Sequence, residues 1–300
     1  MMHLTQNRAT TGKLLALALL LAAIVASLML AAKPAHASTT FTVNSTADHA
    51  DQNLDIGSCD TGYDVPGAGG VMEPECTLRA AIEQANYTPG PDTINFAIPG
   101  TGVHAIVPVT QLPTITGPVT INGYSQPGAQ PNQKAVGSDA VLKIELNGAE
   151  AMGTEGLKIE ASNSTVKGLV INNWHYAGVR IDGSGATGNR IRGNYIGTDA
   201  SGTKDLGNSS DGVGIEDGSG STVGGATAAE RNVISGNKGN GIGIYGGGNR
   251  IAGNYVGTDK NGTAPLGNAV GVDIHEASNN YVGAQRPAHA TSSPPASTTA

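Results

Sequence analysis

The feature that most constrains this chain is a stretch of 20 residues that occurs twice. NRIRGNYIGTDASGTKDLGN begins at Asn189, and NRIAGNYVGTDKNGTAPLGN begins at Asn249, 60 residues later. A shorter unit, Gly-Val/Ile-x-Ile, begins at Gly178, Gly212, Gly241 and Gly271. Its intervals are about 30 residues, and a regular period of this size is typical of architectures in which each repeat packs only on its neighbours.

The repeated units predict stacked coils of short strands, a β-solenoid. Each unit alternates apolar residues and is bounded by Gly or Asn, with no helix between units. The 60-residue interval between the two copies therefore spans two coils. The coil between the copies carries VGGATAAERNVISGN instead of the GNYIGTD connection. We expect Ile191 and Ile196 to face inward, and Asn189 and Asn194 to secure turns by stacking with asparagines of neighbouring coils. A third N-x-I-x-G-N unit begins at Asn232.

The composition agrees with thin, repetitive β-structure. The chain has 300 residues with 44 glycines, only 4% aromatic and 14% charged residues. The formal net charge is −7, and no run of basic residues follows residue 40. Nucleic-acid binding is therefore not expected, because it needs clustered Lys or Arg to neutralise phosphates.

The sequence divides into four parts. Residues 1–37 are predicted to be a signal peptide, because Arg8 and Lys13 precede a long apolar stretch that ends at an Ala35-His36-Ala37 cleavage pattern. An uncleaved membrane anchor is the alternative; cleavage would leave no membrane span. Either way we expect a secreted or cell-surface protein. Residues 38–92 form an N-terminal cap segment, residues 93–283 the β-helix, and residues 284–300 a disordered tail or a frameshifted or truncated repeat.

The cap segment contains the two cysteines of the chain, Cys59 and Cys76. In an oxidising compartment such a pair favours a disulfide, and a two-ligand metal site is the alternative. CTLRAAIEQAN, which begins at Cys76, predicts a helix with Thr77 as N-cap. Leu78, Ile82 and Ala85 lie on one face of it.

At CTLRAAIEQAN, with FTVNSTADHAD and Cys59 before it, the chain resembles the CSLREA-domain proteins of bacterial surfaces. Thr77 and Ala80 differ from the name-giving letters. VTINGYSQPGA, STVKGLVINN and the long repeat look like the β-helix repeats that often follow that domain. The resemblance implies an all-β fold, a right-handed parallel β-helix of the pectin-lyase type whose first coil is covered by the cap segment. It implies little about activity, because this fold also carries lyases, hydrolases and adhesins.

Three groups of residues are candidate sites. Asp48, Asp51 and Asp55 lie in an acidic loop whose oxygens could hold calcium, although the spacing is not that of an EF-hand and a solvated turn is the alternative. No other cofactor is expected. Asp182, Glu216 and Asp273 follow or lie in the Gly-x-x-Ile strands and could line one face as catalytic carboxylates, with Arg180 and His275 nearby. Asp199 and Asp259 recur in the repeat turns, which favours a structural role for them.

The third group is Trp174, His175 and Tyr176, which could contact carbohydrate by stacking on sugar rings; a hydrophobic plug under a turn is the alternative. We therefore expect an exported, non-catalytic surface protein that contacts a polysaccharide or cell-surface glycan. A polysaccharide lyase or glycosidase on the same scaffold is one alternative, and a truncated fragment of a larger surface protein is another. An uncovered last coil would fray or self-associate, with weak protection of the amides of residues 270–281.

Overall fold

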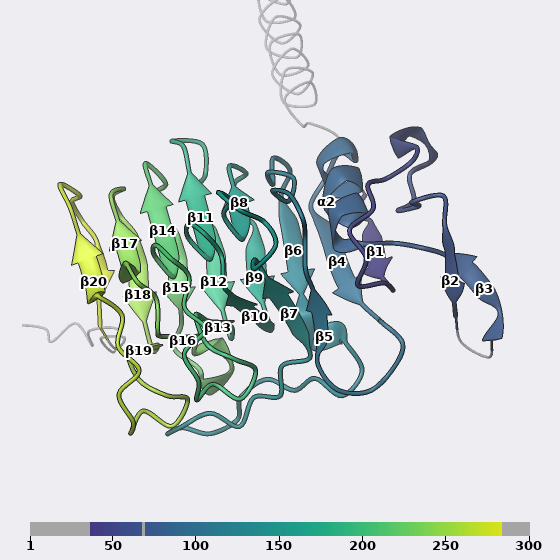
Figure 1. Cartoon of the computed structure of the whole chain (residues 1–300). Coiled ribbons are helices and arrows are strands. Elements are labelled where there is room, and N and C mark those ends of the chain that lie inside the picture. Colours follow the sequence, from purple (N-terminus) through teal and green to yellow (C-terminus); the bar gives the residue numbers. More distant parts are fainter. Residues whose placement is uncertain (1–36, 68–69, 284–300) are drawn as a thin grey trace, which may run out of the picture. The chain divides into compact units, whose positions relative to one another are not determined.

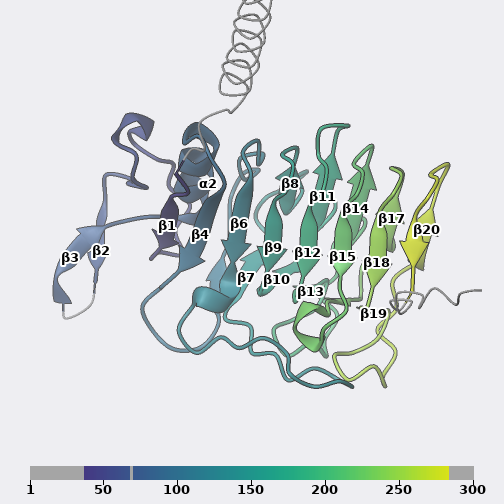
Figure 2. The same ribbon diagram turned by 180° about the vertical axis from the view of Figure 1, so that it is seen from behind.

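The computed structural model describes residues 37–67 and 70–283. The predicted tail and all of the predicted signal peptide except Ala37 lie outside these residues. From Thr40 to Val282 the chain winds into a parallel β-helix, with the coils side by side and α2 at one end (Figures 1 and 2). The predicted fold class is confirmed.

Three parallel sheets run along the coils. The first sheet contains β1 (Thr40–Val43), β4 (Asp92–Phe96), β6 (Val119–Asn122), β9 (Thr165–Lys167), β12 (Arg190–Arg192), β15 (Thr222–Gly224), β18 (Arg250–Ala252) and β21 (Tyr281–Val282). The second sheet contains β5 (His104–Ile106), β7 (Ile144–Asn147), β10 (Leu169–Asn172), β13 (Tyr195–Ile196), β16 (Val233–Ile234) and β19 (Tyr255–Val256). The third sheet contains β8 (Leu157–Ile159), β11 (Val179–Asp182), β14 (Val213–Glu216), β17 (Asn240–Ile244) and β20 (Val270–Ile274).

The 60-residue interval between the two copies of the repeat spans two coils, as predicted. Arg190 pairs in register with Thr222, and Thr222 pairs with Arg250, so one complete coil lies between the two copies. Ile191 and Ile196 are fully buried. Alternation along each strand sends every second side chain into the narrow core and the others to the surface. Positions that face outward on adjacent coils therefore form straight rows.

Asparagine ladders close the turns inside the coils. Asn194, Asn232 and Asn254 stack through side-chain amides at 3.2 and 2.9 Å, and Asn208, Asn237 and Asn268 do so at 2.9 Å for both contacts. The three N-x-I-x-G-N units do not all begin strands of the same sheet. The strand that follows Asn232 belongs to the second sheet, whereas those after Asn189 and Asn249 belong to the first, because extra turns fall at different points of alternate coils.

The N-terminal end is covered by α2 (Leu78–Tyr87), which ends one residue later than predicted. Thr77 caps it by accepting the Ala80 backbone N–H at 3.1 Å, and Leu78, Ile82 and Ala85 are buried. Cys59 and Cys76 form the predicted disulfide. Five other elements complete this region and the connections: the antiparallel pair β2 (Asp64–Pro66) and β3 (Met72–Pro74), and the short helices η1 (Leu54–Ile56), η3 (Gly123–Ser125) and η4 (Ala228–Glu230).

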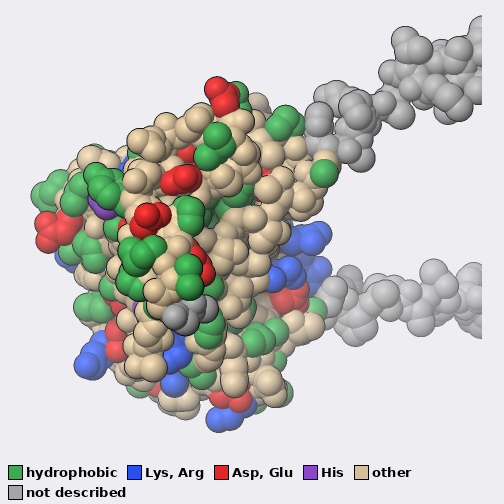
Figure 3. All heavy atoms as spheres, turned by 90° about the vertical axis from the view of Figure 1, so that its right-hand side faces the viewer, with side chains coloured by type: hydrophobic (Ala, Val, Ile, Leu, Met, Phe, Trp, Pro, Cys, Tyr) green, Lys and Arg blue, Asp and Glu red, His purple; other side chains and the backbone are tan. Residues whose placement is uncertain are grey.

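The last described coil is more exposed than the others. Ile274 and Val282 are 43% and 47% exposed, whereas their register partners on the preceding coil, Ile244 and Ile251, are buried. Seen from the opposite, N-terminal end, acidic and hydrophobic side chains are interspersed, and lysine and arginine side chains lie at the right-hand edge and along the lower margin (Figure 3). Within residues 37–67 and 70–283, no helix has the length and apolar character needed to cross a membrane.

Candidate functional site

The outer face of the third sheet carries two rows of charged side chains. Arg180 pairs in register with Lys158 on one side and with Gly214 on the other. Two residues further along β11, Asp182 pairs with Glu216. The period of two along each strand brings all four side chains to the outer surface. Charges from three successive coils therefore meet there.

Two cations link these carboxylates into a network. The Lys158 ammonium lies 2.8 Å from Glu160 and 2.9 Å from Asp182. The Arg180 guanidinium lies 3.1 Å from Glu155 and 3.4 Å from Glu216. All of these acidic groups are therefore held by a neighbouring cation, and each cation is shared between two acids.

A groove of about 440 Å³ lies beside this network. Its lining consists of Gln111, Gly153, Glu155, Lys158, Tyr176, Arg180 and Asp182. Tyr176 is 48% exposed, which leaves much of its side chain open to solvent. Gln111 fixes one wall, because its side chain donates to the Glu155 carbonyl at 3.0 Å and accepts the Glu155 N–H at 2.9 Å. The groove is therefore polar and rigid, with one aromatic side chain available at its surface.

Burial and neighbouring charges shift the pKa values of the ionisable side chains in and beside the groove. Burial raises the pKa of Glu155 above its usual range, against the opposing effects of Arg180 and Lys158. Burial likewise raises the pKa of Glu216. Hydrogen bonds to Glu160 and Asp182 raise the pKa of Lys158. Lys158 is therefore firmly protonated at neutral pH, the opposite of what a general base requires.

The structure brings together two of the three predicted carboxylates. Asp182 and Glu216 are register neighbours, but Asp273 pairs with Gly243, in the row that also contains Arg180 and Gly214. Three strand spacings separate Asp273 from Asp182, a distance of about 14 Å along the sheet. The expectation that Asp273 joins the other two is wrong, because the Gly-x-x-Ile units align by their apolar residues and Asp273 occupies the x position.

The predicted aromatic group divides between core and surface. Trp174 is fully buried, and its indole N–H donates to the Leu146 carbonyl at 3.2 Å, so it is a hydrophobic plug and not a surface contact. His175 is exposed, and its ring meets that of Tyr176 edge-on, with centroids 5.3 Å apart. Only Tyr176 lines the groove.

The three carboxylates of the proposed calcium loop have separate partners. Asp48 binds Arg79 through both oxygens at 2.9 Å, Asp51 accepts the Asn53 N–H at 2.9 Å, and Asp55 accepts the Tyr87 hydroxyl. Over residues 37–67 and 70–283, no group of three or more His, Cys, Asp or Glu side chains is arranged to hold a metal ion. Asp48 and Asp55 thus join the acidic loop to α2, and Asp51 makes its contact within the loop.

Sequence reasoning missed Glu155, Lys158 and Gln111. Lys158 lies in GLKI, which differs from the Gly-Val/Ile-x-Ile unit by one leucine and occupies the preceding coil. Admitting leucine to that unit would have placed Lys158 beside Arg180. Gln111 and Glu155 lie 44 residues apart, and no sequence pattern connects them.

No protein family model and no curated protein matches this chain. Among solved structures, the crystal structure of pectate lyase Pel9A is similar, with a TM-score of 0.43 and 15% sequence identity. The similarity covers 74% of this chain and 48% of that chain, so it spans about half the length of Pel9A. The parallel register between successive coils of this chain itself defines the β-helix.

Proposed function

We propose that the protein is an exported, non-catalytic protein that contacts a polysaccharide or cell-surface glycan through the groove on the third sheet. The observation that carries the proposal is the half-exposed Tyr176 beside Lys158, Arg180 and Asp182 in one groove. An aromatic ring surrounded by fixed hydrogen-bonding groups suits a sugar, whose ring is apolar on its faces and polar at its edges.

The charge network favours binding over catalysis. A lyase requires a base that loses its proton readily, and the pKa of Lys158 is raised by its contacts with Glu160 and Asp182. Arg180 is similarly engaged by Glu155 and Glu216. Side chains that hold one another in this way make a stable surface for hydrogen bonds to hydroxyls.

Export and family membership complete the proposal. The apolar N-terminal segment with its Ala35-His36-Ala37 pattern supports secretion or display at the cell surface. The disulfide and the Thr77-capped helix support membership of the CSLREA-domain proteins. Expression with the leader, followed by N-terminal sequencing of the secreted product, tests export; a product that begins at Met1 and stays inside the cell would contradict it.

The groove is tested by retention on a panel of neutral and acidic polysaccharides. Wild-type protein should be retained by at least one of them, and Tyr176→Ala should weaken that binding roughly 3- to 10-fold, the effect of losing one aromatic stacking contact. Tyr63→Ala is the control, because Tyr63 is 59% exposed and lies outside the groove. Absence of retention on every glycan would remove the proposal, and equal losses for both variants would place the contact elsewhere.

Hydrolysis is the second candidate, favoured by one observation. Asp182 and Glu216 are register neighbours, and burial raises the pKa of Glu216, as a general acid requires. Release of reducing ends during incubation with the same panel, abolished by Glu216→Gln, would establish this alternative. Binding without any product supports the non-catalytic proposal.

A further inference from the structure

A second pocket lies on the outer face of the first sheet. It encloses about 410 Å³ and is lined by Asn122, Tyr124, Pro131, Lys167, Arg192, Thr227, Ala229 and Glu230. At about 30 Å³ per water molecule, this is the volume of roughly 14 waters. The pocket is therefore large enough for more than a simple inorganic ion.

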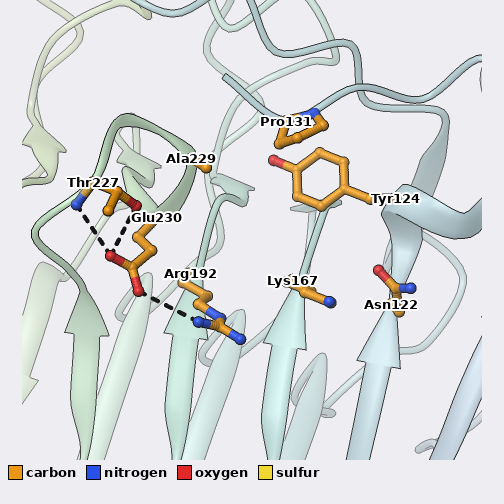
Figure 4. Close-up of a pocket in the computed structure, with 8 residues that line it drawn as sticks. All are labelled: Asn122, Tyr124, Pro131, Lys167, Arg192, Thr227, Ala229 and Glu230. Carbon is orange, nitrogen blue, oxygen red and sulfur yellow. Dashed lines mark hydrogen bonds and ion pairs between the residues drawn. The ribbon is translucent and has the colours of Figure 1, made fainter. Parts of the chain in front are cut away.

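The floor of the pocket is a row of three polar side chains on adjacent strands. Lys167 of β9 pairs in register with Asn122 of β6 and with Arg192 of β12. Figure 4 shows Lys167 beneath the ring of Tyr124, Arg192 on the neighbouring strand beside it, and Glu230 on the far side of Arg192. Two positive charges thus lie one strand spacing apart, about 4.8 Å at the backbone.

These two cations are incompletely neutralised. The Lys167 ammonium makes no hydrogen bond or ion pair with any side chain or carbonyl of the described residues, and burial together with Arg192 lowers the pKa of Lys167. Arg192 is 3.3 Å from Glu230 through Nη1, while its Nε is buried without a partner. Glu230 is the only carboxylate among the lining residues, so the pocket retains a net positive charge.

The walls are fixed before any ligand arrives. The Tyr124 hydroxyl donates to the Gly193 carbonyl at 2.6 Å. The ring of Tyr124 packs on Gly168, where an added Cβ would come within 2.8 Å of it. On the opposite wall, Glu230 closes a capping box with Thr227, accepting from its N–H at 3.1 Å and its hydroxyl at 2.9 Å.

A bridge ties the two walls together. Asn132, next to Pro131, donates to the Ala228 carbonyl of η4 at 3.0 Å. Arg231, which follows η4, donates to the Gly137 carbonyl at 2.7 Å and the Ala135 carbonyl at 2.8 Å. Preorganisation of this kind lowers the cost of binding, because little ordering remains for the ligand to impose.

The positive charge continues along the sheet. A neighbouring pocket of about 330 Å³ shares Arg192 and Glu230 and adds Arg190 and Arg250. Arg190 and Arg250 are separated by one strand, that of Thr222. We call Lys167, Arg190, Arg192 and Arg250 the basic strip. It runs parallel to the axis of the coils, on a protein whose net charge is −7.

We propose that the basic strip binds an acidic polysaccharide, with one negatively charged sugar in the Tyr124 pocket and the chain continuing toward Arg250. Carboxylate and sulfate groups share the chemistry that Lys and Arg recognise. The apolar wall of Tyr124, Pro131 and Ala229 suits the C–H face of a sugar ring. A nucleic acid fits less well, because it calls for exposed aromatic platforms on which bases stack, and the ring of Tyr124 is only partly exposed.

The test is a calorimetric titration of the full secreted protein with three classes of oligosaccharide: carboxylated, sulfated and neutral. Wild type should bind an acidic class and not the neutral one, with affinity that falls as salt rises. Lys167→Gln should weaken binding roughly 10- to 100-fold, the range for loss of one charge-assisted hydrogen bond. Lys238→Gln, a change at an exposed lysine outside both pockets, should have no effect.

A second variant separates the pocket from general charge. Ala229→Trp fills the pocket from η4 without changing the charge, and it should also abolish binding of the acidic class. Unchanged affinity in both Lys167→Gln and Ala229→Trp, equal binding of neutral sugars, or equally tight binding of a single-stranded DNA oligomer would each overturn the proposal. Tyr176→Ala should leave this binding intact, so the outcome is independent of the groove on the third sheet.

Discussion

Two glutamates of this protein each lie beside an arginine: Glu216 beside Arg180 on the third sheet, and Glu230 beside Arg192 on the first. Burial raises the pKa of Glu216, and the nearby Asp182 and other carboxylates add to the rise against Arg180. Burial also acts to raise the pKa of Glu230, but hydrogen bonds from Thr227 and Ala226, together with Arg192, bring that pKa below its usual range. An adjacent arginine alone does not decide the pKa; the remaining charges and hydrogen bonds do.

The two pKa shifts contribute to stability with opposite signs. The folded protein holds a proton on Glu216 more tightly than the unfolded chain does, so this contribution declines as pH rises from the ordinary value of 4.5 through the raised pKa. The folded protein holds a proton on Glu230 less tightly, so this contribution is complete above 4.5 and is lost as pH falls through the lowered pKa. The two faces thus respond oppositely to mild acid.

The largest expected effect comes from Arg180→Gln, which leaves Glu155 and Glu216 without their shared cation. Glu155 is the more critical partner, because its side chain is only 13% exposed. We expect the free energy of unfolding at pH 7 to fall by about 1–2 kcal/mol, below the cost for a fully buried pair because Arg180 is partly exposed. Urea unfolding at pH 7 and pH 4.5 measures it. The loss should shrink at the lower pH, where both acids take up protons, and an equal loss at both would contradict the account.

The next largest effect on stability is expected from replacing Glu230 or Glu216 by alanine, and the two substitutions should differ. Glu230→Ala removes the capping box of η4 and should cost about 1 kcal/mol at pH 7. Glu216→Ala removes a carboxylate with a raised pKa and should change stability by less than about 0.5 kcal/mol. Thermal unfolding of the two variants under identical conditions compares them, and similar losses would break the distinction.

Thr227→Val is a smaller change on the first sheet. It keeps the shape of the side chain and removes the hydroxyl that donates to Glu230 at 2.9 Å. The pKa of Glu230 should rise toward its ordinary value, with a loss of about 0.5 kcal/mol at pH 7 because Thr227 is exposed. A carbon-13 NMR titration of the Glu230 carboxyl group detects the shift. Thr203→Val, in a turn away from Glu230, is the control and should leave that titration unchanged.

Salt should have the smallest effect. The ion pairs on both faces are partly open to solvent, so raising NaCl to 1 M shortens the screening length to about 3 Å. The loss in the free energy of unfolding caused by Arg180→Gln should change by less than about 0.5 kcal/mol between low salt and 1 M NaCl, at pH 7 and at pH 4.5. A larger change would mean that longer-range charges, and not the contacts around Arg180, determine the behaviour of Glu216.

The fold could be predicted from the sequence because the sequence repeats with the same period as the coils. The copies at Asn189 and Asn249 fixed the number of coils between Arg190 and Arg250, and Thr77 marked the start of α2 correctly. The motif at Asn232, however, also begins strands of a different sheet at Asn189 and Asn249, so the motif alone does not assign a strand to its sheet. A six-residue pattern does not reveal on which side of an extra turn it falls.

The sites were harder to predict, since stacking gathers residues that are far apart in sequence. No basic run exists after residue 40, yet Lys167, Arg190, Arg192 and Arg250 form one strip because coils place residues about 25 to 30 positions apart next to one another. The repeated Asn-Arg-Ile was the one sequence pattern that indicated part of the basic strip. It placed Arg190 and Arg250 in equivalent positions, but nothing marked Lys167 as their neighbour.

The asparagine ladders have a mechanical consequence. Asn194, Asn232 and Asn254 each join one coil to the next through a bond directed along the axis of the coils, within a wall of parallel backbone hydrogen bonds. Tension along that axis loads every bond between two coils at once, whereas a pull on a chain end opens them one after another. A protein held at its first coil and pulled along the axis from its last coil should therefore withstand more force than the same protein unwound from a chain end, and single-molecule pulling in the two geometries would measure the difference.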